Sequence, residues 1–149
     1  MKSVLIRWVI GFTVPIVFFG VAILLFFQPG PSGVVAALRL KDGSEYMVIQ
    51  NFEWSPEPYD VALYTRESGG LWSRSYVDHE ASRWFDVKMT YDSHSDLITV
   101  TKWGKKVLEI DRATRKFWNA KDGGRVSELP AVGRGDTPDY PFPDIPVTP

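Results

Sequence analysis

Three adjacent side chains that could bind a metal ion or transfer a proton, Asp78, His79 and Glu80, stand near the middle of the sequence. A carboxylate beside an imidazole suits general acid and base catalysis, and both groups are ligands for divalent metals. The residues before them read as a strand, and successive side chains of a strand point to opposite faces. Asp78 and Glu80 would then point away from His79, so the three cannot chelate one ion as a unit. The sequence favours a strand that ends in a turn at Ala81 and Ser82.

A second polar cluster, DSHSD, contains the other histidine, His94. Asp92, His94 and Asp96 stand at alternate positions, as in the first half of a calcium-binding loop. Such a loop needs a glycine at its sixth position and a glutamate at its twelfth, where this chain has Leu97 and Trp103. We therefore interpret the cluster as a polar hairpin loop.

The sequence lacks the motifs of the common catalytic mechanisms. The sequence contains no Ser-His-Asp arrangement, nucleophile elbow, phosphate-binding glycine loop or dinucleotide fingerprint. It has no cysteine, which excludes disulfides, thiolate metal sites and a cysteine nucleophile. We therefore expect no cofactor and favour a role other than catalysis. A hydrolase that combines His79 with Glu80 or His94 is the one catalytic alternative that stays open.

The charge balance argues against a nucleic-acid partner. After position 33 the chain carries 15 Lys and Arg against 18 Asp and Glu. Nucleic-acid binding needs a net basic face that displaces counterions from phosphates. With 149 residues, the chain has room for one domain.

The first element expected along the chain is a long apolar segment near the N-terminus. Residues 9–27 contain no charged side chain, and Trp8 extends this run to 20 residues. A helix of that length spans about 30 Å, the thickness of the hydrocarbon core of a bilayer. We predict a transmembrane helix over residues 8–28 that binds the chain to the lipid bilayer, preceded by a short cytoplasmic segment, residues 1–7.

The orientation of this helix follows from its flanks. Lys2 and Arg7 precede it, which places the N-terminus in the cytoplasm and the rest of the chain outside. A buried core helix and a cleaved signal peptide are the alternatives. A signal peptide has a shorter apolar region and a small-x-small cleavage site, and the one tolerable site, Val35-Ala36-Ala37, falls in the first predicted strand. A membrane anchor and a cleaved signal peptide would both deliver the rest of the chain outside the cytoplasm.

After a linker at residues 29–33, residues 34–119 form short alternating runs between turn residues, which is typical of β-strands. Asp42-Gly43 is the strongest hairpin signal. The short connections exclude parallel crossovers, so we expect an all-β, antiparallel up-and-down meander of about eight strands, either a small barrel or a sandwich. The predicted strands are Val34–Lys41, Ser44–Glu53, Tyr59–Arg66, Leu71–Asp78, Ser82–Tyr91, Leu97–Trp103, Lys106–Ile110 and Thr114–Trp118.

Alternation assigns one face of each strand to the core. The predicted core residues are Met47, Ile49, Val61, Leu63, Phe85, Val87, Met89, Ile98, Val100, Leu108 and Ile110. The remaining faces combine aromatic and charged side chains, and Trp and Tyr are enriched at binding hot spots. The candidate partner surface consists of Trp72, Tyr76, Trp84 and Trp103.

Six basic residues lie close together in the sequence, in the last predicted strands and the turns between them. They could contact anionic lipid head groups, or they could be solvated residues at a hairpin tip that protect an edge strand. These residues are Lys102, Lys105, Lys106, Arg112, Arg115 and Lys116. The remaining segment, residues 120–149, is rich in proline, so we expect it to be extended and mobile.

These features predict a single-pass membrane protein that displays a β domain outside the cytoplasm. The favoured role is binding or structural, with a protein of the cell envelope as partner. The alternatives are a binder of a small lipid or sugar inside a barrel, and the hydrolase around His79.

Overall fold

The computed structural model describes residues 32–53, 57, 59–80, 84–129 and 135–149. The predicted cytoplasmic segment and transmembrane helix, residues 1–28, lie outside these residues. Within the described ranges, no helix has both the length and the apolar character needed to cross a bilayer.

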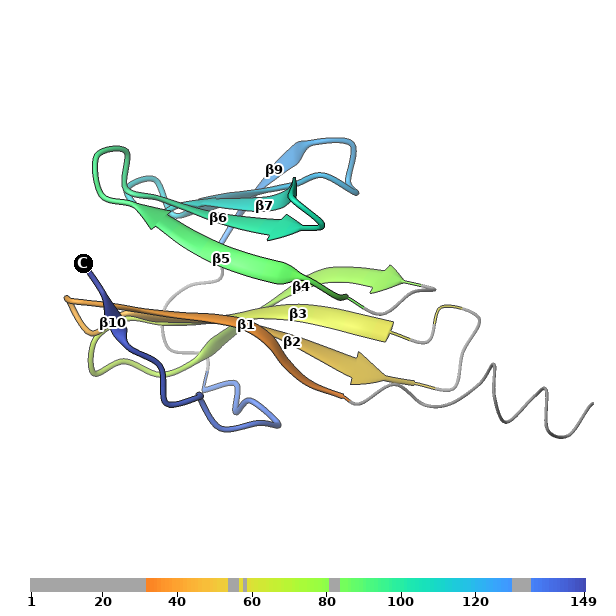
Figure 1. Ribbon diagram of the computed structural model, residues 1–149, viewed down its shortest axis with the longest axis horizontal. Helices are drawn as coiled ribbons and strands as arrows, with labels where there is room; N and C mark the ends of the chain where they lie inside the picture. Colours follow the sequence, from red (N-terminus) through yellow and green to blue (C-terminus); the bar gives the residue numbers. More distant parts are fainter. Residues whose placement is uncertain (1–31, 54–56, 58, 81–83, 130–134) are drawn as a thin grey trace, which may run out of the picture. The chain divides into compact units, whose positions relative to one another are not determined.

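The described residues are all-β, as predicted, and form two five-stranded sheets (Figure 1). Within each sheet, strands that follow one another in the chain are antiparallel neighbours, and only the pair β1 and β10 is parallel. Sheet A has the order β10-β1-β2-β3-β4, and sheet B has the order β5-β6-β7-β8-β9. The strands are β1 (Gly33–Leu40), β2 (Glu45–Phe52), β3 (Tyr59–Arg66), β4 (Ser73–Glu80), β5 (Val87–Asp92), β6 (Leu97–Lys102), β7 (Lys105–Asp111), β8 (Lys116–Asn119), β9 (Arg125–Glu128) and β10 (Val147–Thr148).

The two sheets pack face to face around a shared apolar core, so the meander folds as a sandwich and does not close as a barrel. Alternate positions of the strands supply this core because side chains of a strand alternate between faces. Sheet A contributes the fully buried Val48, Val61 and Leu63. Sheet B contributes Ile98, Val100, Leu108 and Ile110, also fully buried.

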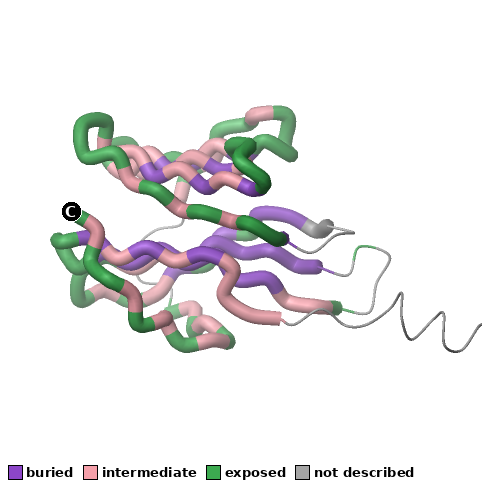
Figure 2. Tube along the Cα trace, in the orientation of Figure 1, coloured by how far each residue is buried: buried purple, intermediate pink, exposed green. Residues whose placement is uncertain are grey.

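Met47 and Ile49 of β2 are buried, as predicted, but their face is not the one that meets sheet B. Val48 and Tyr46 belong to the core between the sheets, whereas Met47 and Ile49 belong to a second apolar cluster. The first six residues of β2 are all buried, so alternation could not identify which face meets the other sheet (Figure 2). A strand covered on both faces loses the polar and apolar alternation that marks a half-buried strand.

The second cluster is covered by the end of the chain, residues 135–149, which we call the C-terminal strap. Tyr140 and Phe142 of the strap pack against the cluster that contains Met47 and Ile49. β10 at the end of the strap pairs with Arg39 and Leu40 of β1. The segment predicted to be an extended, proline-rich tail therefore includes residues that cover sheet A.

The register before β5 also differs from the prediction. Trp84 is only 3% exposed and lies in the core, whereas Phe85, a predicted core residue, is 51% exposed. Asp86 between Phe85 and β5 has a φ of 46°, which breaks the extended conformation and therefore the alternation of faces. The strand begins at Val87, five residues later than the predicted Ser82.

Alternate strands of the meander run in opposite directions, so its turns fall at two ends. β1 begins at Gly33, opposite Gln50, and the Gln50 side chain accepts a hydrogen bond from the backbone of Trp84 at 3.1 Å. The β6–β7 turn lies at this end too, because Trp103 N–H donates to the carbonyl of Asp86 at 3.2 Å. We call this the Gly33 end. The opposite end, the pocket end, carries the β1–β2, β3–β4, β5–β6 and β7–β8 turns (Figure 1).

Candidate functional site

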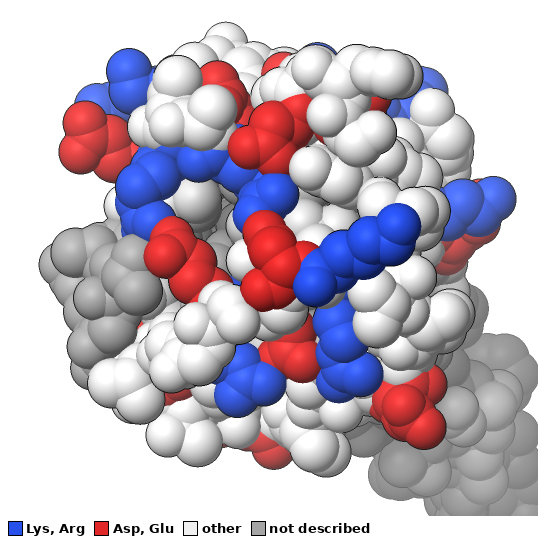
Figure 3. All heavy atoms as spheres, turned by 90° about the vertical axis from the view of Figure 1, so that its left-hand side faces the viewer, with Lys and Arg blue, Asp and Glu red and all other residues white. Residues whose placement is uncertain are grey.

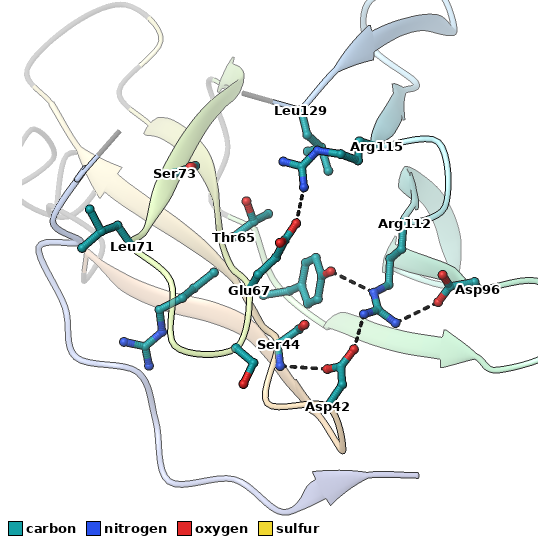
Figure 4. A pocket seen from close by; sticks show the side chains of 13 residues that line it. Asp42, Ser44, Thr65, Glu67, Leu71, Ser73, Asp96, Arg112, Arg115 and Leu129 are labelled. Carbon is teal, nitrogen blue, oxygen red and sulfur yellow. Dashed lines mark hydrogen bonds and ion pairs between the residues drawn. The ribbon is translucent and has the colours of Figure 1, made fainter. Parts of the chain in front are cut away.

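The turns of the pocket end enclose a pocket of about 340 Å³ between the two sheets (Figure 4). Its lining is mainly polar. The charged lining residues are Asp42, Arg66, Glu67, Asp96, Arg112 and Arg115. Hydroxyl groups come from Ser44, Tyr46, Thr65, Ser68 and Ser73, and apolar surface from Leu71 and Leu129.

The β1–β2 turn fixes one wall of the pocket. The Asp42-Gly43 pair correctly predicted a hairpin here, but the connection runs over residues 41–44 and is not a two-residue turn. Of the predicted pair, only Gly43 has a positive φ, 83°, which glycine adopts without steric cost. One carboxylate oxygen of Asp42 accepts a hydrogen bond from Ser44 N–H at 2.8 Å. The other oxygen of Asp42 faces the second sheet and pairs with Arg112 (Figure 4).

Arg112, from the β7–β8 turn, is the centre of the polar network. Its Nε donates to the hydroxyl of Tyr46 at 3.0 Å, and its Nη1 donates to Asp96 at 2.8 Å. With the Asp42 ion pair, one guanidinium joins three turns and both sheets. The side chain of Arg112 is 18% exposed, so these interactions are less screened by solvent than ordinary surface pairs.

A second ion pair joins the sheets nearby. Arg115 of the β7–β8 turn pairs with Glu67 of the β3–β4 turn. Arg115 also accepts a backbone hydrogen bond from Leu129 N–H at 2.8 Å, which fixes the segment after β9 at this end. Both charged side chains of the pair are substantially exposed, so this link is weaker than the network around Arg112.

Ionisation of these groups follows from their surroundings. Burial alone would lower the pKa of Arg112, but the hydrogen bonds to Tyr46 and Asp42 outweigh it and hold the pKa above its ordinary value. Burial would raise the pKa of Asp42, but hydrogen bonds from Ser44 and Arg112 hold it below its ordinary value. Burial raises the pKa of Tyr46, which keeps its hydroxyl protonated. Near neutral pH, Arg112 is therefore protonated, Asp42 is ionised and Tyr46 is neutral.

The whole pocket end carries mixed charge. Figure 3 shows this end of the molecule, with basic and acidic side chains alternating around a hollow instead of gathering by sign. The pocket itself is lined by three acidic and three basic residues. This arrangement can bind a polar group that offers both donors and acceptors, and it does not select a ligand by net charge.

The structure does not bring the four predicted partner-surface aromatics together. Trp72 stacks on Phe142 of the strap, with ring centroids 6.0 Å apart. Tyr76 is exposed in β4, and Trp103 is exposed in the β6–β7 turn at the Gly33 end. Placing Trp84 on an exposed face was wrong, because the break at Asp86 turns its side chain into the core.

The six basic residues are divided between the two ends of the sandwich. Lys102, Lys105 and Lys106 flank the β6–β7 turn, and the length of β7 separates them from Arg112, Arg115 and Lys116. Placing Lys102 at an exposed surface was wrong, since it is 7% exposed and its Nζ lies 5.2 Å from the centre of the Trp84 ring. Lys102 shares the inward face of β6 with Ile98 and Val100, in accord with strand alternation.

The two histidines lie at opposite ends of the sandwich. The backbone of His79 pairs with Asp60 near the start of β3, whereas His94 lies in the β5–β6 turn at the pocket end. The side chains of His79 and Glu80 lie outside the described part of the structure. Asp78 beside them is buried and pairs with Lys121 at 2.7 Å. Among the described residues, no group of three His, Asp or Glu side chains could hold a metal ion.

The sequence had not identified the pocket network, although a signal for it was present. In an up-and-down meander every second turn lies at the same end. Asp42, Glu67, Asp96 and Arg112 each belong to such a turn, and all four turns could be recognised in the sequence. Counting turns by parity would have placed these charges together, even without knowledge of where the meander divides into two sheets.

Comparison of the chain with models of protein families, with curated proteins and with solved structures found no match.

Proposed function

We propose that this protein is a membrane-anchored binding module, held outside the cytoplasm by a transmembrane helix over residues 8–28. The observation that carries the proposal is the position of the pocket, at the opposite end of the sandwich from Gly33. The eight residues of β1 span about 26 Å at roughly 3.3 Å per residue. An anchor that precedes Gly33 would hold the pocket away from the bilayer and present it to a partner in the cell envelope.

The partner we propose is a protein. The pocket is built from turns on a rigid two-sheet scaffold, an arrangement that commonly carries binding sites. Its balanced charge suits a polypeptide segment, which offers amide donors and carbonyl acceptors together. A polyanion would gain no net attraction from this lining, since three acidic residues offset the three basic ones. The charged groups of the network bind one another, which favours recognition over catalysis as the role of the site.

A small polar molecule is a second candidate ligand. The pocket volume of about 340 Å³ falls within the range of small-molecule sites, at its lower end. The interior of the sandwich is filled by the core, so a small ligand would bind at the pocket end and not inside a barrel. Stabilisation of the full chain by a small molecule in a thermal-shift screen would favour this candidate over the protein partner.

The orientation and the binding surface can be tested together. A membrane-impermeant amine cross-linker, applied to intact cells that produce the full chain, should join the protein to its partner. Leu71→Asp should reduce the adduct several-fold, because Leu71 lines the pocket and is 59% exposed. Val126→Asp is the matched control, an aliphatic residue in β9 that is 56% exposed and does not line the pocket.

Two results would contradict the proposal. If the chain reacts with the cross-linker only after lysis, the domain is not outside the cytoplasm. If Leu71→Asp and Val126→Asp lower the adduct equally, the pocket end is not the binding surface. Circular dichroism of each purified variant checks that both remain folded.

A further inference from the structure

Two large aromatic side chains at the Gly33 end are more than half exposed. Phe85 is 51% exposed and Trp103 is 57% exposed. They lie on neighbouring segments, since Trp103 N–H donates to the carbonyl of Asp86, the residue after Phe85. Gly33, where the described chain enters sheet A, belongs to this same end through Gln50 and Trp84, as described above.

Trp103 occupies a backbone position that does not favour it. It forms the two-residue β6–β7 turn with Gly104, and the two residues have φ values of 52° and 71°. Turns with positive φ at both central positions prefer Asn-Gly or Asp-Gly. A bulky residue is uncommon in this region, because its Cβ comes too close to the following carbonyl oxygen. The backbone conformation of the turn therefore does not account for a tryptophan at position 103.

Trp103 is in contact with Lys102. The Nζ of Lys102 lies 4.9 Å from the centre of the Trp103 ring and 5.2 Å from that of the Trp84 ring. This cation–π contact holds the Trp103 ring at the margin of the core. More than half of the Trp103 surface remains open to the surroundings.

We propose that the Gly33 end rests on the surface of the lipid bilayer, with Trp103 and Phe85 inserted among the head groups. This inference depends on the proposed anchor at residues 8–28. The apolar run ends at Phe27, and the five residues from Gln28 to Ser32 can span no more than about 18 Å when fully extended. The anchor would therefore hold this end of the sandwich close to the bilayer whatever path the link takes.

The chemistry of the two side chains fits a membrane interface. Tryptophan is enriched there because its ring is apolar while its N–H can bond to water or head groups. Such a contact would orient the sandwich upright and keep the pocket at a fixed height above the membrane. The pocket end would stand about 20–26 Å farther out, the length of the strands between the two ends.

The test uses single-cysteine variants, because the chain has no cysteine of its own. Lys105→Cys marks the Gly33 end and His94→Cys marks the pocket end, and both residues are exposed. Each full-length variant carries a fluorophore and is reconstituted into phosphatidylcholine and phosphatidylglycerol vesicles that contain a lipid with a quencher near its head group. We expect the label at position 105 to be quenched several-fold more than the label at position 94.

Removing the aromatic side chains should abolish this difference. Trp103→Asn in the Lys105→Cys background keeps a residue that suits positive φ, so the turn should form, and quenching should fall toward that of His94→Cys. Phe85→Ser is a second variant, outside the turn, with the same expected direction. Unchanged quenching in both variants, with native circular dichroism, would overturn the inference.

Vesicle flotation separates this inference from the anchor on which it rests. If the chain floats with the vesicles but positions 105 and 94 are quenched equally, the contact is absent while the anchor stands. If the chain does not float, the anchor and the contact are both wrong. If it floats with position 105 unquenched, and a cross-linker attached at position 105 joins the chain to another protein in intact cells, the aromatic pair binds a protein and not lipid.

Discussion

Strands β2 and β3 of sheet A are covered on both faces, whereas the strands of sheet B are covered on one. In β2 and β3 of sheet A, the first six residues are all buried. In β6 of sheet B, buried residues alternate strictly with half-exposed ones. The difference comes from the C-terminal strap, which covers the outer face of sheet A (Figure 2). The apolar pattern of a strand therefore depends on whether one or both of its faces are covered, and it identifies the inner face only when one face is exposed.

The outer faces of the two sheets accordingly have different chemistry. On sheet A, the strap adds Tyr140 and Phe142 to an apolar cluster, and its Asp139 accepts a hydrogen bond from the Asn51 side chain at 3.1 Å. On sheet B, Lys106 lies 4.8 Å from the centre of the Trp118 ring, and Val126 is exposed. The outer face of sheet A depends on a distant part of the chain, and that of sheet B faces its surroundings directly.

The largest effect is expected where the two sheets do not differ, in the core that they share. Leu63→Ala in sheet A and Leu108→Ala in sheet B should each lower the free energy of unfolding by about 2–5 kcal/mol, because both side chains are fully buried. Urea denaturation followed by fluorescence and by circular dichroism measures this. Transitions that fail to coincide between the two probes would show that the sheets unfold separately, and the comparison would then be between two independent units.

A smaller effect should separate the outer faces. Phe142→Ala combined with Tyr140→Ala should lower the free energy of unfolding by about 1–3 kcal/mol, less than a fully buried pair would, because both side chains are half-buried. It should also increase the binding of a hydrophobic dye, since Met47 and Ile49 lose their cover. Val126→Ala on sheet B is the control and should change neither quantity appreciably. Equal effects of the strap and control variants would remove the distinction between the faces.

The smallest effect concerns the link between the sheets, and it depends on pH. The pKa of Asp42 is lowered in the folded protein from an ordinary value of 3.8, as hydrogen bonds from Ser44 and Arg112 outweigh the opposing effect of burial. The unfolded chain therefore takes up the proton first as the pH falls. The stability contributed by Asp42 is present above pH 3.8 and is lost as the pH falls through the folded-state pKa.

Asp42→Asn tests this link. Its melting temperature should fall less steeply below pH 3.8 than that of the natural protein. The difference should be small because the Asp42 side chain is about half exposed. Asp122→Asn, an exposed aspartate in the β8–β9 turn, is the control and should preserve the natural acid dependence. A parallel shift of both variants would mean that the Asp42 pair contributes nothing to holding the sheets together.

Much of the fold could be predicted from local patterns. Alternation identified eight of the strands, β1 to β8, and the core positions of β6 and β7, and Asp42-Gly43 identified the first hairpin. β9 and β10 were missed, because both lie in the segment predicted to be an extended tail. Alternation fails wherever a distant layer or one unusual dihedral angle intervenes. Both faces of β2 are buried, because the strap covers the face that the other sheet does not. The positive φ of Asp86 breaks the alternation, so that Trp84 lies in the core and Phe85 is exposed.

The pocket was missed for a different reason. Each of its charged residues is an ordinary turn residue in its own segment, and only the combination is unusual. Arg112, Asp42 and Asp96 come from three turns, and their meeting depends on how the two sheets align. No spacing within the sequence records that alignment. The count of turns along the meander predicts the shared end but not the contacts.

The direction of the strands has a mechanical consequence for the proposed module, which would be anchored at one end and bound to a partner at the other. A partner that pulled on the pocket end, against an anchor before Gly33, would load the sheets along their strands. Hydrogen bonds between antiparallel strands lie across that direction, so the load would shear many of them at once and not peel them one by one. Arg112 would carry part of the same load from sheet A to sheet B through its pair with Asp42. Such a sandwich would serve as a stiff, tension-bearing link.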